Sequence, residues 1–506
     1  MTKFKPFLLT LLVPALFSCS DITTVKRETG KTAPQNSKSP FMKAHMPNGD
    51  VYIFDGWIVD EPNRVISGNG VKQNFNRDVI ATSTFSLPVD SVSLFETNVK
   101  EVSPIMSGMT VLTGVSVAGT ILCLTTPKAC FGSCPTFYID RDGNEFLQAE
   151  GFSSSISPSL EAADVDALYF ADPKTTEFKI EMKNEALETH IVRHANLVLV
   201  PKLKERSIQD VSGKYWQTEK LIHPQTATSS EGDILKQVSE MDNQERFSLS
   251  DETNLKSDEY INLEFQTTPG KEYALVVGGR QTLLTTFLLY QAYSYMGNDY
   301  GKWLNMLEQN NELFSDVDPS RFLGGIEIQT QNLFGFWTTA GEIHEFGPLA
   351  TDLHMVKIGT GKTVSKKIRL KLNRGNWRID YTALAELGKP AEPVTIKPSL
   401  VLKDNSINRE ALDKLTDDSK YLTTLPGDSY TLIYQLPENY SNYTFYLESK
   451  GYYLEWMRDE WAVEENPDKL VQMIMSPSKT LKELAPKYKE LEPSMEKVFW
   501  NSKYAH

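Results

Sequence analysis

The chain has 506 residues, of which 40% are apolar and 23% charged, and these proportions are typical of a globular protein. Its 52 basic residues against 66 acidic ones give a net charge of -14, which argues against a nucleic-acid-binding surface and a polybasic membrane patch. Four cysteines are too few for a disulfide scaffold. We therefore expect a large, acidic protein of about two to four domains.

The N-terminus has the features of a bacterial secretion signal over residues 1–18. Lys3 and Lys5 precede an apolar stretch that is too short to span a membrane. The sequence LFSC, ending at Cys19, resembles a lipobox, which implies cleavage before Cys19 and diacylation of its thiol. Ser20 in the next position, in place of Asp, resembles outer-membrane sorting. We expect a lipoprotein anchored in the outer membrane, facing either the periplasm or the cell surface; the alternative is an ordinary signal peptide with a chance cysteine.

Polarity and periodicity divide the following residues into three segments. Residues 19–44 are polar and predict a flexible tether. Residues 45–100 alternate between apolar and polar positions, which predicts an N-terminal β-meander. The uncharged segment 102–127 is long enough to cross a bilayer, but its Gly, Ser and Thr residues make insertion costly. We favour a buried helix there over a membrane helix.

The rest of the chain predicts mostly antiparallel β structure, with meanders and sandwich or jelly-roll-like domains. We expect a β domain over 128–268, a helical hairpin over 269–320 and a β-sandwich over 321–436. A strand and a helical tail, interrupted by prolines, should follow over 437–506. The strongest helix covers 281–296, where apolar residues recur at helical spacing until Gly297.

Several motifs resemble those of a family of large, uncharacterised bacterial cell-envelope lipoproteins. They occur in a common order between about residues 45 and 465, and they include MPNGDVYIFDGWIVD, CFGSCP, GNWRIDYTAL and KGYYLEWMRDEW. The resemblance implies an envelope location, but it implies no reaction, ligand or catalytic residue.

The CFGSCP motif contains Cys130 and Cys134, which could close a small loop. In an exported protein oxidation is the default state, so we predict a structural disulfide between them. Two alternatives remain open: a free thiol or a different pairing with Cys123, and a redox pair. Redox pairs more often have two intervening residues, and here there are three.

Other motifs favour structural roles. His190 and His194 have a spacing that suits a metal on a helix, but the surrounding residues predict a strand, on which the two side chains lie too far apart for one metal. We expect partly exposed strand histidines and no metal site. The sequence around Asp140 and Gly143 predicts a hairpin turn rather than a calcium loop. Gly278-Gly279-Arg280, before the main helix, predicts a plain turn rather than an anion site.

Trp337 and Trp377, with Phe336, fall in the predicted sandwich and could stack on sugar rings if they are exposed. The sequence nominates no catalytic residue and no cofactor. We therefore expect a non-enzymatic structural or interaction role in the cell envelope, with a membrane partner through the lipid anchor and an envelope protein or polysaccharide as a further partner. The alternatives are a surface glycan-binding protein and an unrecognised hydrolase.

The lipid anchor gives a direct prediction. Replacing Cys19 by alanine (Cys19→Ala) removes the thiol that carries the lipid, so the exported protein should move from the membrane pellet to the soluble fraction after cell fractionation. Membrane retention of a variant still cleaved at the same site would contradict the anchor, or would mean that 102–127 also inserts.

Overall fold

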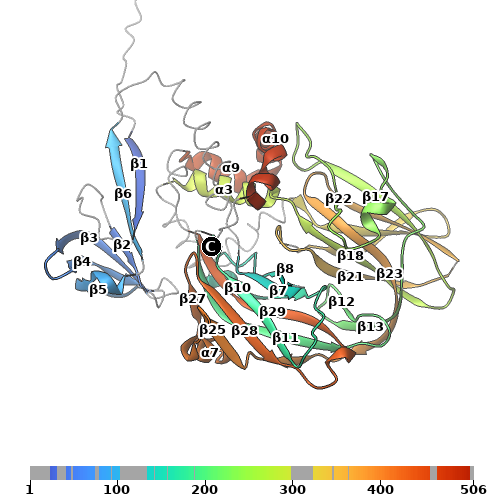
Figure 1. Cartoon of the computed structure of the whole chain (residues 1–506). Coiled ribbons are helices and arrows are strands. Elements are labelled where there is room, and N and C mark those ends of the chain that lie inside the picture. Colours follow the sequence, from blue (N-terminus) through green and yellow to red (C-terminus); the bar gives the residue numbers. More distant parts are fainter. Residues whose placement is uncertain are drawn as a thin grey trace, which may run out of the picture.

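The computed structural model describes residues 23–30, 42–46, 50–73, 79–92, 94–102, 134–141, 143–156, 158–186, 188–297, 323–344, 347–362, 364–455 and 464–501. Over these ranges the chain forms five antiparallel sheets and four α-helices, so the mainly β class is confirmed (Figure 1). Cys19, Cys123, Cys130 and the segment 103–127 lie outside them. No helix within these ranges is long and apolar enough to cross a bilayer.

Sheet A is N-terminal and has the strand order β1-β6-β2-β3-β4-β5. Its strands are β1 (Thr23–Gly30), β2 (Met42–His45), β3 (Val51–Asp60), β4 (Val65–Gln73), β5 (Val79–Pro88) and β6 (Leu94–Val102). Strands β2 to β5 form the predicted meander, and β6 returns beside β2. The expected tether differs from the structure, because β1 pairs with β6 along its whole length.

The first sandwich consists of sheets B and C, which pack face to face. Sheet B contains β7 (Thr136–Arg141), β8 (Asn144–Glu150), β10 (Glu177–Lys183), β25 (Leu400–Lys403), β26 (Ser406–Ile407) and β28 (Ser429–Gln435). Sheet C contains β9 (Ala162–Ala167), β11 (Glu188–Pro201), β24 (Val394–Ile396), β27 (Leu422–Thr424) and β29 (Tyr443–Glu455). Helix α7 (Arg409–Thr416) starts at Asn408, whose side chain caps it, and covers one end of their core.

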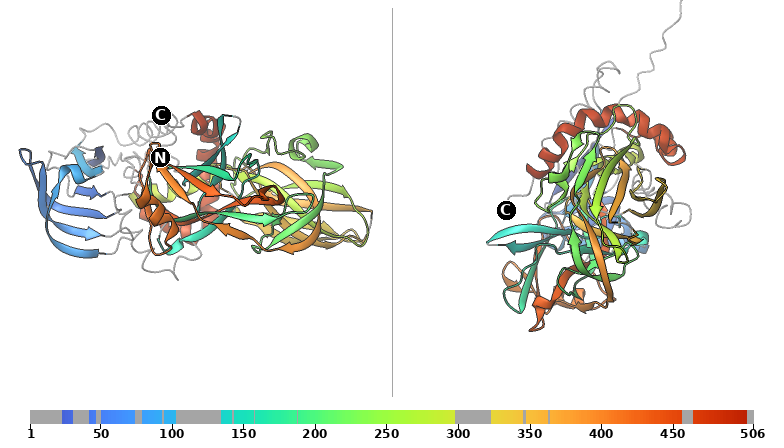
Figure 2. Two further views of the ribbon diagram at one scale, coloured as in Figure 1. Left: turned by 60° about the horizontal axis from the view of Figure 1, so that its bottom comes forward. Right: turned by 90° about the vertical axis from the view of Figure 1, so that its right-hand side faces the viewer.

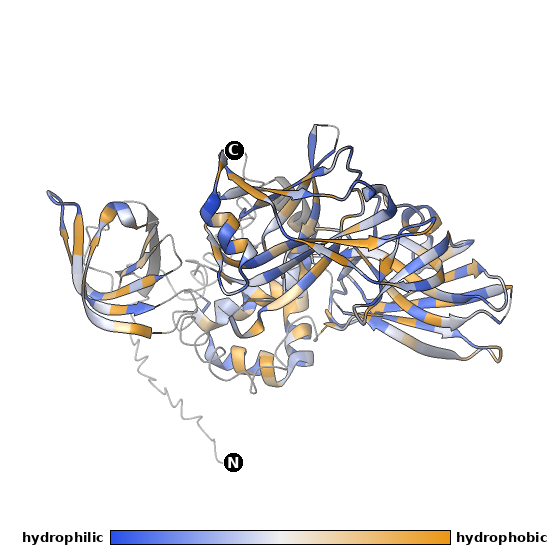
Figure 3. Cartoon of the chain, turned by 90° about the horizontal axis from the view of Figure 1, so that it is seen from below, coloured by the Kyte–Doolittle hydropathy of each residue, from blue (hydrophilic) through white to orange (hydrophobic). Residues whose placement is uncertain are grey.

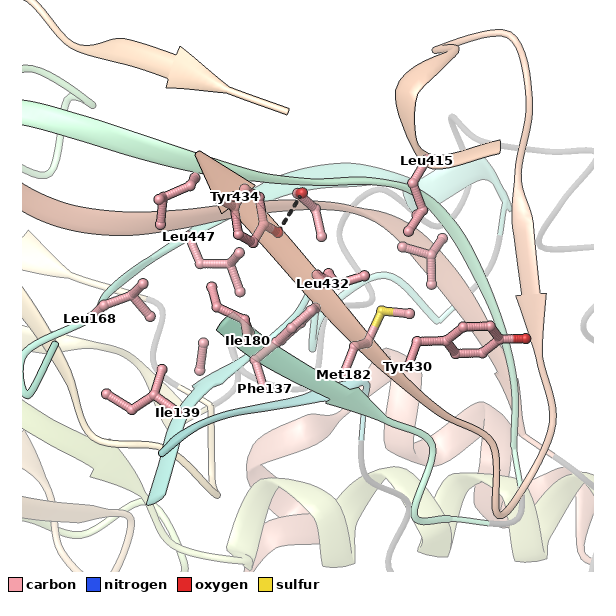
Figure 4. Packing of buried hydrophobic residues seen from close by; sticks show 14 of the residues in the cluster. Phe137, Ile139, Leu168, Ile180, Met182, Leu415, Tyr430, Leu432, Tyr434 and Leu447 are labelled. Atoms are coloured by element: carbon pink, nitrogen blue, oxygen red, sulfur yellow. Dashed lines mark hydrogen bonds between the residues drawn. The ribbon is translucent and has the colours of Figure 1, made fainter. Parts of the chain in front are cut away.

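The core of the first sandwich is drawn in Figure 4. Phe137 and Ile180 of sheet B meet Leu447 of sheet C among other fully buried side chains. Tyr434 is also fully buried, and its hydroxyl donates a hydrogen bond of 2.9 Å to the carbonyl oxygen of Ala195. This bond satisfies the polar end of a ring that is otherwise in an apolar environment.

The second sandwich consists of sheets D and E. Sheet D contains β12 (Ile208–Gln209), β13 (Tyr215–Ile222), β16 (Arg246–Phe247), β18 (Glu272–Gln281), β21 (Asp352–Thr360) and β23 (Trp377–Ala391). Sheet E has the order β15-β14-β17-β22-β19-β20. Its strands are β14 (Thr226–Ser229), β15 (Gly232–Asp233), β17 (Asp258–Gln266), β19 (Ile326–Gln331), β20 (Trp337–Ile343) and β22 (Ser365–Asn373).

A third core joins the two sandwiches, because the outer face of sheet C packs on the outer face of sheet D. On β11, Leu197 and Leu199 face sheet B, whereas Val198 and Val200 face sheet D. On β18, Leu275 faces sheet E, whereas Ala274 and Val276 face sheet C. The four sheets therefore stack in the order B, C, D, E, and the two middle sheets are apolar on both faces.

The two sandwiches are not consecutive in sequence. Strands β7 to β11 and β24 to β29 form the first sandwich, and the second is inserted between Pro201 and Val394. The expected domains 128–268 and 321–436 therefore each contribute strands to both sandwiches. Alternating hydrophobicity indicates that a segment is a strand, but it does not identify the distant strand with which it pairs.

A helical layer lies against the sandwiches and contains α3 (Leu284–Met296), α9 (Pro467–Met475) and α10 (Pro477–Asn501). Gly297, at a φ of 53°, ends α3 as predicted. Tyr290 of α3 donates a 2.6 Å hydrogen bond to Glu455 at the end of β29. Helix α10 continues through Pro486 and Pro493, contrary to the expected interruptions, and Figure 2 shows the C-terminal helices as an arc.

Buried carboxyl groups gather where sheets B, C and D meet. Glu150 of β8, Asp166 of β9 and Asp352 of β21 are all buried. Glu150 accepts a 2.7 Å hydrogen bond from the backbone amide of Leu349, and Asp352 accepts one of 2.8 Å from that of Ala167. Burial raises the pKa of Glu150 to about 8. Burial, together with Asp164 and Asp352, also raises the pKa of Asp166.

The raised pKa of Glu150 predicts a pH-dependent stability. The folded protein holds this proton up to about pH 8, whereas the unfolded chain releases it near 4.5. Because the folded state binds more protons in that window, the free energy of unfolding should fall as pH rises, by up to about 1.4 kcal/mol per pH unit. Glu150→Gln should reduce this slope in denaturant titrations at several pH values. Equal slopes for the variant and the parent protein would contradict the assignment.

The buried Trp377 predicts a large effect on stability. Its ring is fully buried between sheets D and E, so Trp377→Ala should lower the free energy of unfolding by about 3 to 5 kcal/mol. Trp337 lies half-buried on the surface of sheet E, and Trp337→Ala should cost about 1 kcal/mol or less. Urea denaturation of both variants measures the difference. Equal losses would contradict the placement of the two rings.

Candidate binding face on sheet E

The two tryptophans proposed as ligand contacts have different environments. Trp377 begins β23 and is fully buried, so it cannot contact a ligand, and that part of the prediction is wrong. Trp337 begins β20 at the outer face of sheet E and is half-buried. The structure therefore separates the two residues, and a binding hypothesis can rest on Trp337 alone.

Side chains along the strands of sheet E point alternately into the D/E core and away from it, so one face of the sheet is exposed. In β17, Ile261, Leu263 and Phe265 point into the D/E core, while the intervening residues point outward. Figure 3 shows this alternation of hydrophobic and hydrophilic residues along the strands of the second sandwich. As sheet E is the last of the four layers, its second face can be polar without disturbing a core.

An arginine stacks between two aromatic rings on this face. The guanidinium carbon of Arg369, on β22, lies 4.5 Å from the ring centroid of Trp337 and 4.6 Å from that of Tyr260. Its Nε donates a 2.6 Å hydrogen bond to Gln329. Cation–π contact and hydrogen bonding together fix the orientation of the planar guanidinium.

The register of sheet E places further polar side chains in line with Arg369. Asn262 of β17 and Gln329 of β19 pair directly with Arg369, and Thr339 of β20 pairs with Gln329. All four belong to neighbouring strands, so their side chains form one row across the sheet. We call this row, together with Tyr260, Trp337 and Glu327, the Arg369 face.

Charges on the Arg369 face are balanced. Glu327 accepts hydrogen bonds from Thr339 and, at 2.8 Å, from Gln329, and these bonds lower the pKa of its carboxyl group. Lys371 lies 3.2 Å from Asp258 and 3.9 Å from Glu327, and the hydrogen bond to Asp258 raises its pKa. Both groups are therefore charged at neutral pH.

The chemistry of this face suits a polyhydroxylated ligand. Ring faces can stack on the C–H face of a sugar, and amide, carboxylate and guanidinium groups can exchange hydrogen bonds with its hydroxyls. The flat, exposed surface of a sheet admits an extended chain. It lacks the concave, water-excluding shape that small-molecule sites and active sites usually have.

Of the predicted pair Cys130 and Cys134, the structure describes Cys134. It is buried and forms no disulfide with any other residue that the structure describes. Burial raises the pKa of its thiol, and nearby carboxylates, with Glu150 first among them, raise it further. A redox-active cysteine needs a lowered pKa, so this environment favours a structural role. Cys130 lies outside the described residues, and the disulfide stays a prediction.

The strand histidines are more buried than expected. His190 is fully inside the protein, where its Nε2 lies 2.9 Å from Oε2 of the equally buried Glu188. The expectation of partial exposure is therefore wrong for His190. His194 lies 3.2 Å from Glu448 on the opposite face of the bulged strand β11. Over the described ranges, no group of three or more His, Cys, Asp or Glu residues could hold a metal ion.

Two predicted turns have different outcomes. Asp140 accepts a hydrogen bond from the amide of Gly143 in the β7–β8 hairpin, so the hairpin is confirmed. Gly278-Gly279-Arg280 lies within strand β18 rather than in a turn. Arg280 donates hydrogen bonds of 2.6 and 2.8 Å to Glu245, so its guanidinium holds a buried ion pair. Because it is held in this ion pair, the guanidinium has a structural role.

The hydrolase alternative has one candidate cluster, the buried carboxyl groups at Glu150, Asp166 and Asp352. Raised pKa values in a cluster are typical of active sites as well as of buried structural networks. Here each of the three carboxyl groups accepts a hydrogen bond from a backbone amide, and all three are buried within the part of the chain that the structure describes. A substrate cannot reach them without rearrangement of the layer junction. We assign the cluster to structure.

No family model matches the chain, and no curated protein matches it. Among solved structures, the chain is similar to a GH31 α-xylosidase from Xanthomonas citri at 9% sequence identity. The match covers 83% of this chain and 39% of the length of that enzyme, with a TM-score of 0.15. At this TM-score the similarity says nothing about the fold, activity or substrate of this chain.

Proposed function

We propose that the protein is a non-enzymatic binding component of the bacterial cell envelope that recognises a polysaccharide through the Arg369 face. The observation that carries this proposal is the stack of Tyr260, Arg369 and Trp337 beside a row of polar side chains on an exposed sheet. The face contains both neutral and charged hydrogen-bonding groups, so it offers partners to hydroxyl groups along an extended glycan.

The envelope location in this proposal rests on the sequence. A lipobox ending at Cys19 and the motifs shared with envelope lipoproteins both support it, and the net charge of -14 argues against a nucleic-acid partner. A membrane-tethered protein with its binding face on the last of four stacked sheets is suited to hold a polysaccharide in the envelope.

Aromatic stacking is the interaction whose loss should be measurable. Removing one ring that stacks on a sugar costs about 1.4 kcal/mol, so Trp337→Ala and Tyr260→Ala should each weaken binding about tenfold. Arg369→Lys keeps the charge but loses the planar stack and should weaken binding as well. The measurement is retention on isolated peptidoglycan sacculi, lipopolysaccharide and neutral glucans, followed by calorimetry with the polysaccharide that retains the protein.

Phe247→Ala provides a matched control. Phe247 is partly exposed on sheet D and stacks under Arg378 at 3.9 Å, so this variant removes the same type of contact at another surface. It should bind like the parent protein. Equal effects of Trp337→Ala and Phe247→Ala, no retention on any of the three polysaccharides, or release of reducing sugar ends from them would each contradict the proposal.

A further inference from the structure

The turn between β19 and β20 carries three exposed apolar side chains within four residues. Leu333, Phe334 and Phe336 have exposed fractions of 73%, 85% and 69%. Single exposed hydrophobic residues are normal on a protein surface, but a cluster at the tip of a hairpin indicates an interaction site. We call Asn332–Phe336 the hairpin tip.

The amides of Phe334, Gly335 and Phe336 all have hydrogen-bond acceptors within the hairpin tip. The side-chain oxygen of Asn332 accepts hydrogen bonds of 3.0 Å from the amides of Phe334 and Phe336. Gly335, at a φ of 85°, donates to the carbonyl of Asn332, and its own carbonyl accepts from the side chain of Gln331. The tip is therefore preorganised. In an apolar medium a backbone amide has no water to bond to, and these amides already have partners within the protein.

Cationic and apolar side chains accompany the hairpin tip at the same end of sheet E. Thr330 pairs with Ile368 in the antiparallel ladder, so the start of β22 lies beside the turn. Val364, just before β22, is also highly exposed, and Lys362 and Lys367 are exposed on either side of it. The segment 331–337 contains no charged residue.

We propose that the hairpin tip inserts into the headgroup region of an anionic lipid bilayer. Apolar side chains enter the acyl boundary, Trp337 lies at the interface, and Lys362 and Lys367 contact anionic headgroups. A convex tip of five residues is too small for a standard protein interface, which needs about 800 Å² from each partner. This contact is made by the folded body and is independent of a lipid at Cys19. It is weak and reversible, so it is seen with an excess of vesicles but does not by itself hold the Cys19→Ala protein in the membrane pellet after fractionation.

The experiment uses the processed chain from residue 19 onward with Cys19→Ala, so that neither the apolar signal segment nor a lipid chain contributes to binding. Co-sedimentation with vesicles of phosphatidylethanolamine and phosphatidylglycerol should show binding that falls at least about tenfold in the triple variant Leu333→Ser, Phe334→Ser, Phe336→Ser. Lys362→Glu with Lys367→Glu should weaken binding to these vesicles, but not to vesicles of phosphatidylcholine alone. Ile58→Ser, at a residue 75% exposed on sheet A, is the matched control and should bind normally.

A direct readout comes from Phe334→Trp, whose fluorescence should be quenched by brominated acyl chains. Absence of vesicle binding by the Cys19→Ala protein, equal binding by the triple variant, or no additional quenching relative to the Cys19→Ala parent would each overturn the proposal. A triple variant that binds vesicles normally but loses a protein partner would identify a protein-docking site instead. The triple variant keeps Trp337, so it should still be retained on the polysaccharide. This measurement separates a failure of the membrane proposal from a failure of the proposed glycan function.

Discussion

The central strands of sheets C and D are covered on both faces, and this constraint determines the rest of the architecture. Both sheets must be apolar on both sides, so any polar group within them needs a partner inside the protein. The pair of His190 and Glu188, the amide bonded by Asp352 and the ion pair of Arg280 with Glu245 all meet this need. Residues of these types also occur in active sites, but here each of them is paired with another group of the protein.

The same constraint leaves recognition to the outer layers. Sheet E packs on one side only, so Arg369 and its neighbours can be polar at no cost to a core. The aromatic rings above the sheet stack on a cation that the sheet itself positions through Gln329. The residues that would contact a ligand under the proposed function are thus placed by strand register rather than by loops.

Sequence patterning predicts the strands but not their partners. Alternation identified the N-terminal meander, the turn sequence around Asp140 and Gly143 identified the β7–β8 hairpin, and helical spacing identified α3 with its end at Gly297. The insertion of one sandwich into the other could not be predicted, because β10 pairs with β28 across some 250 residues and local periodicity carries no information about that distance. For the same reason Trp377 and Trp337 looked equivalent, although one lies in a core and the other on a face. Tyr260 and Arg369 were missed because only the register brings them to Trp337.

The two proposed contacts meet at one residue pair. Phe336 ends the hairpin tip and Trp337 begins the strand that carries the Arg369 face, so the positions of the two surfaces are coupled through one rigid hairpin. A bilayer that takes up the tip would fix the end of sheet E at the membrane surface and leave the strands rising away from it. A glycan on the Arg369 face would then lie next to the headgroups. The geometry therefore favours a polysaccharide that is itself close to the membrane over one that is remote from it.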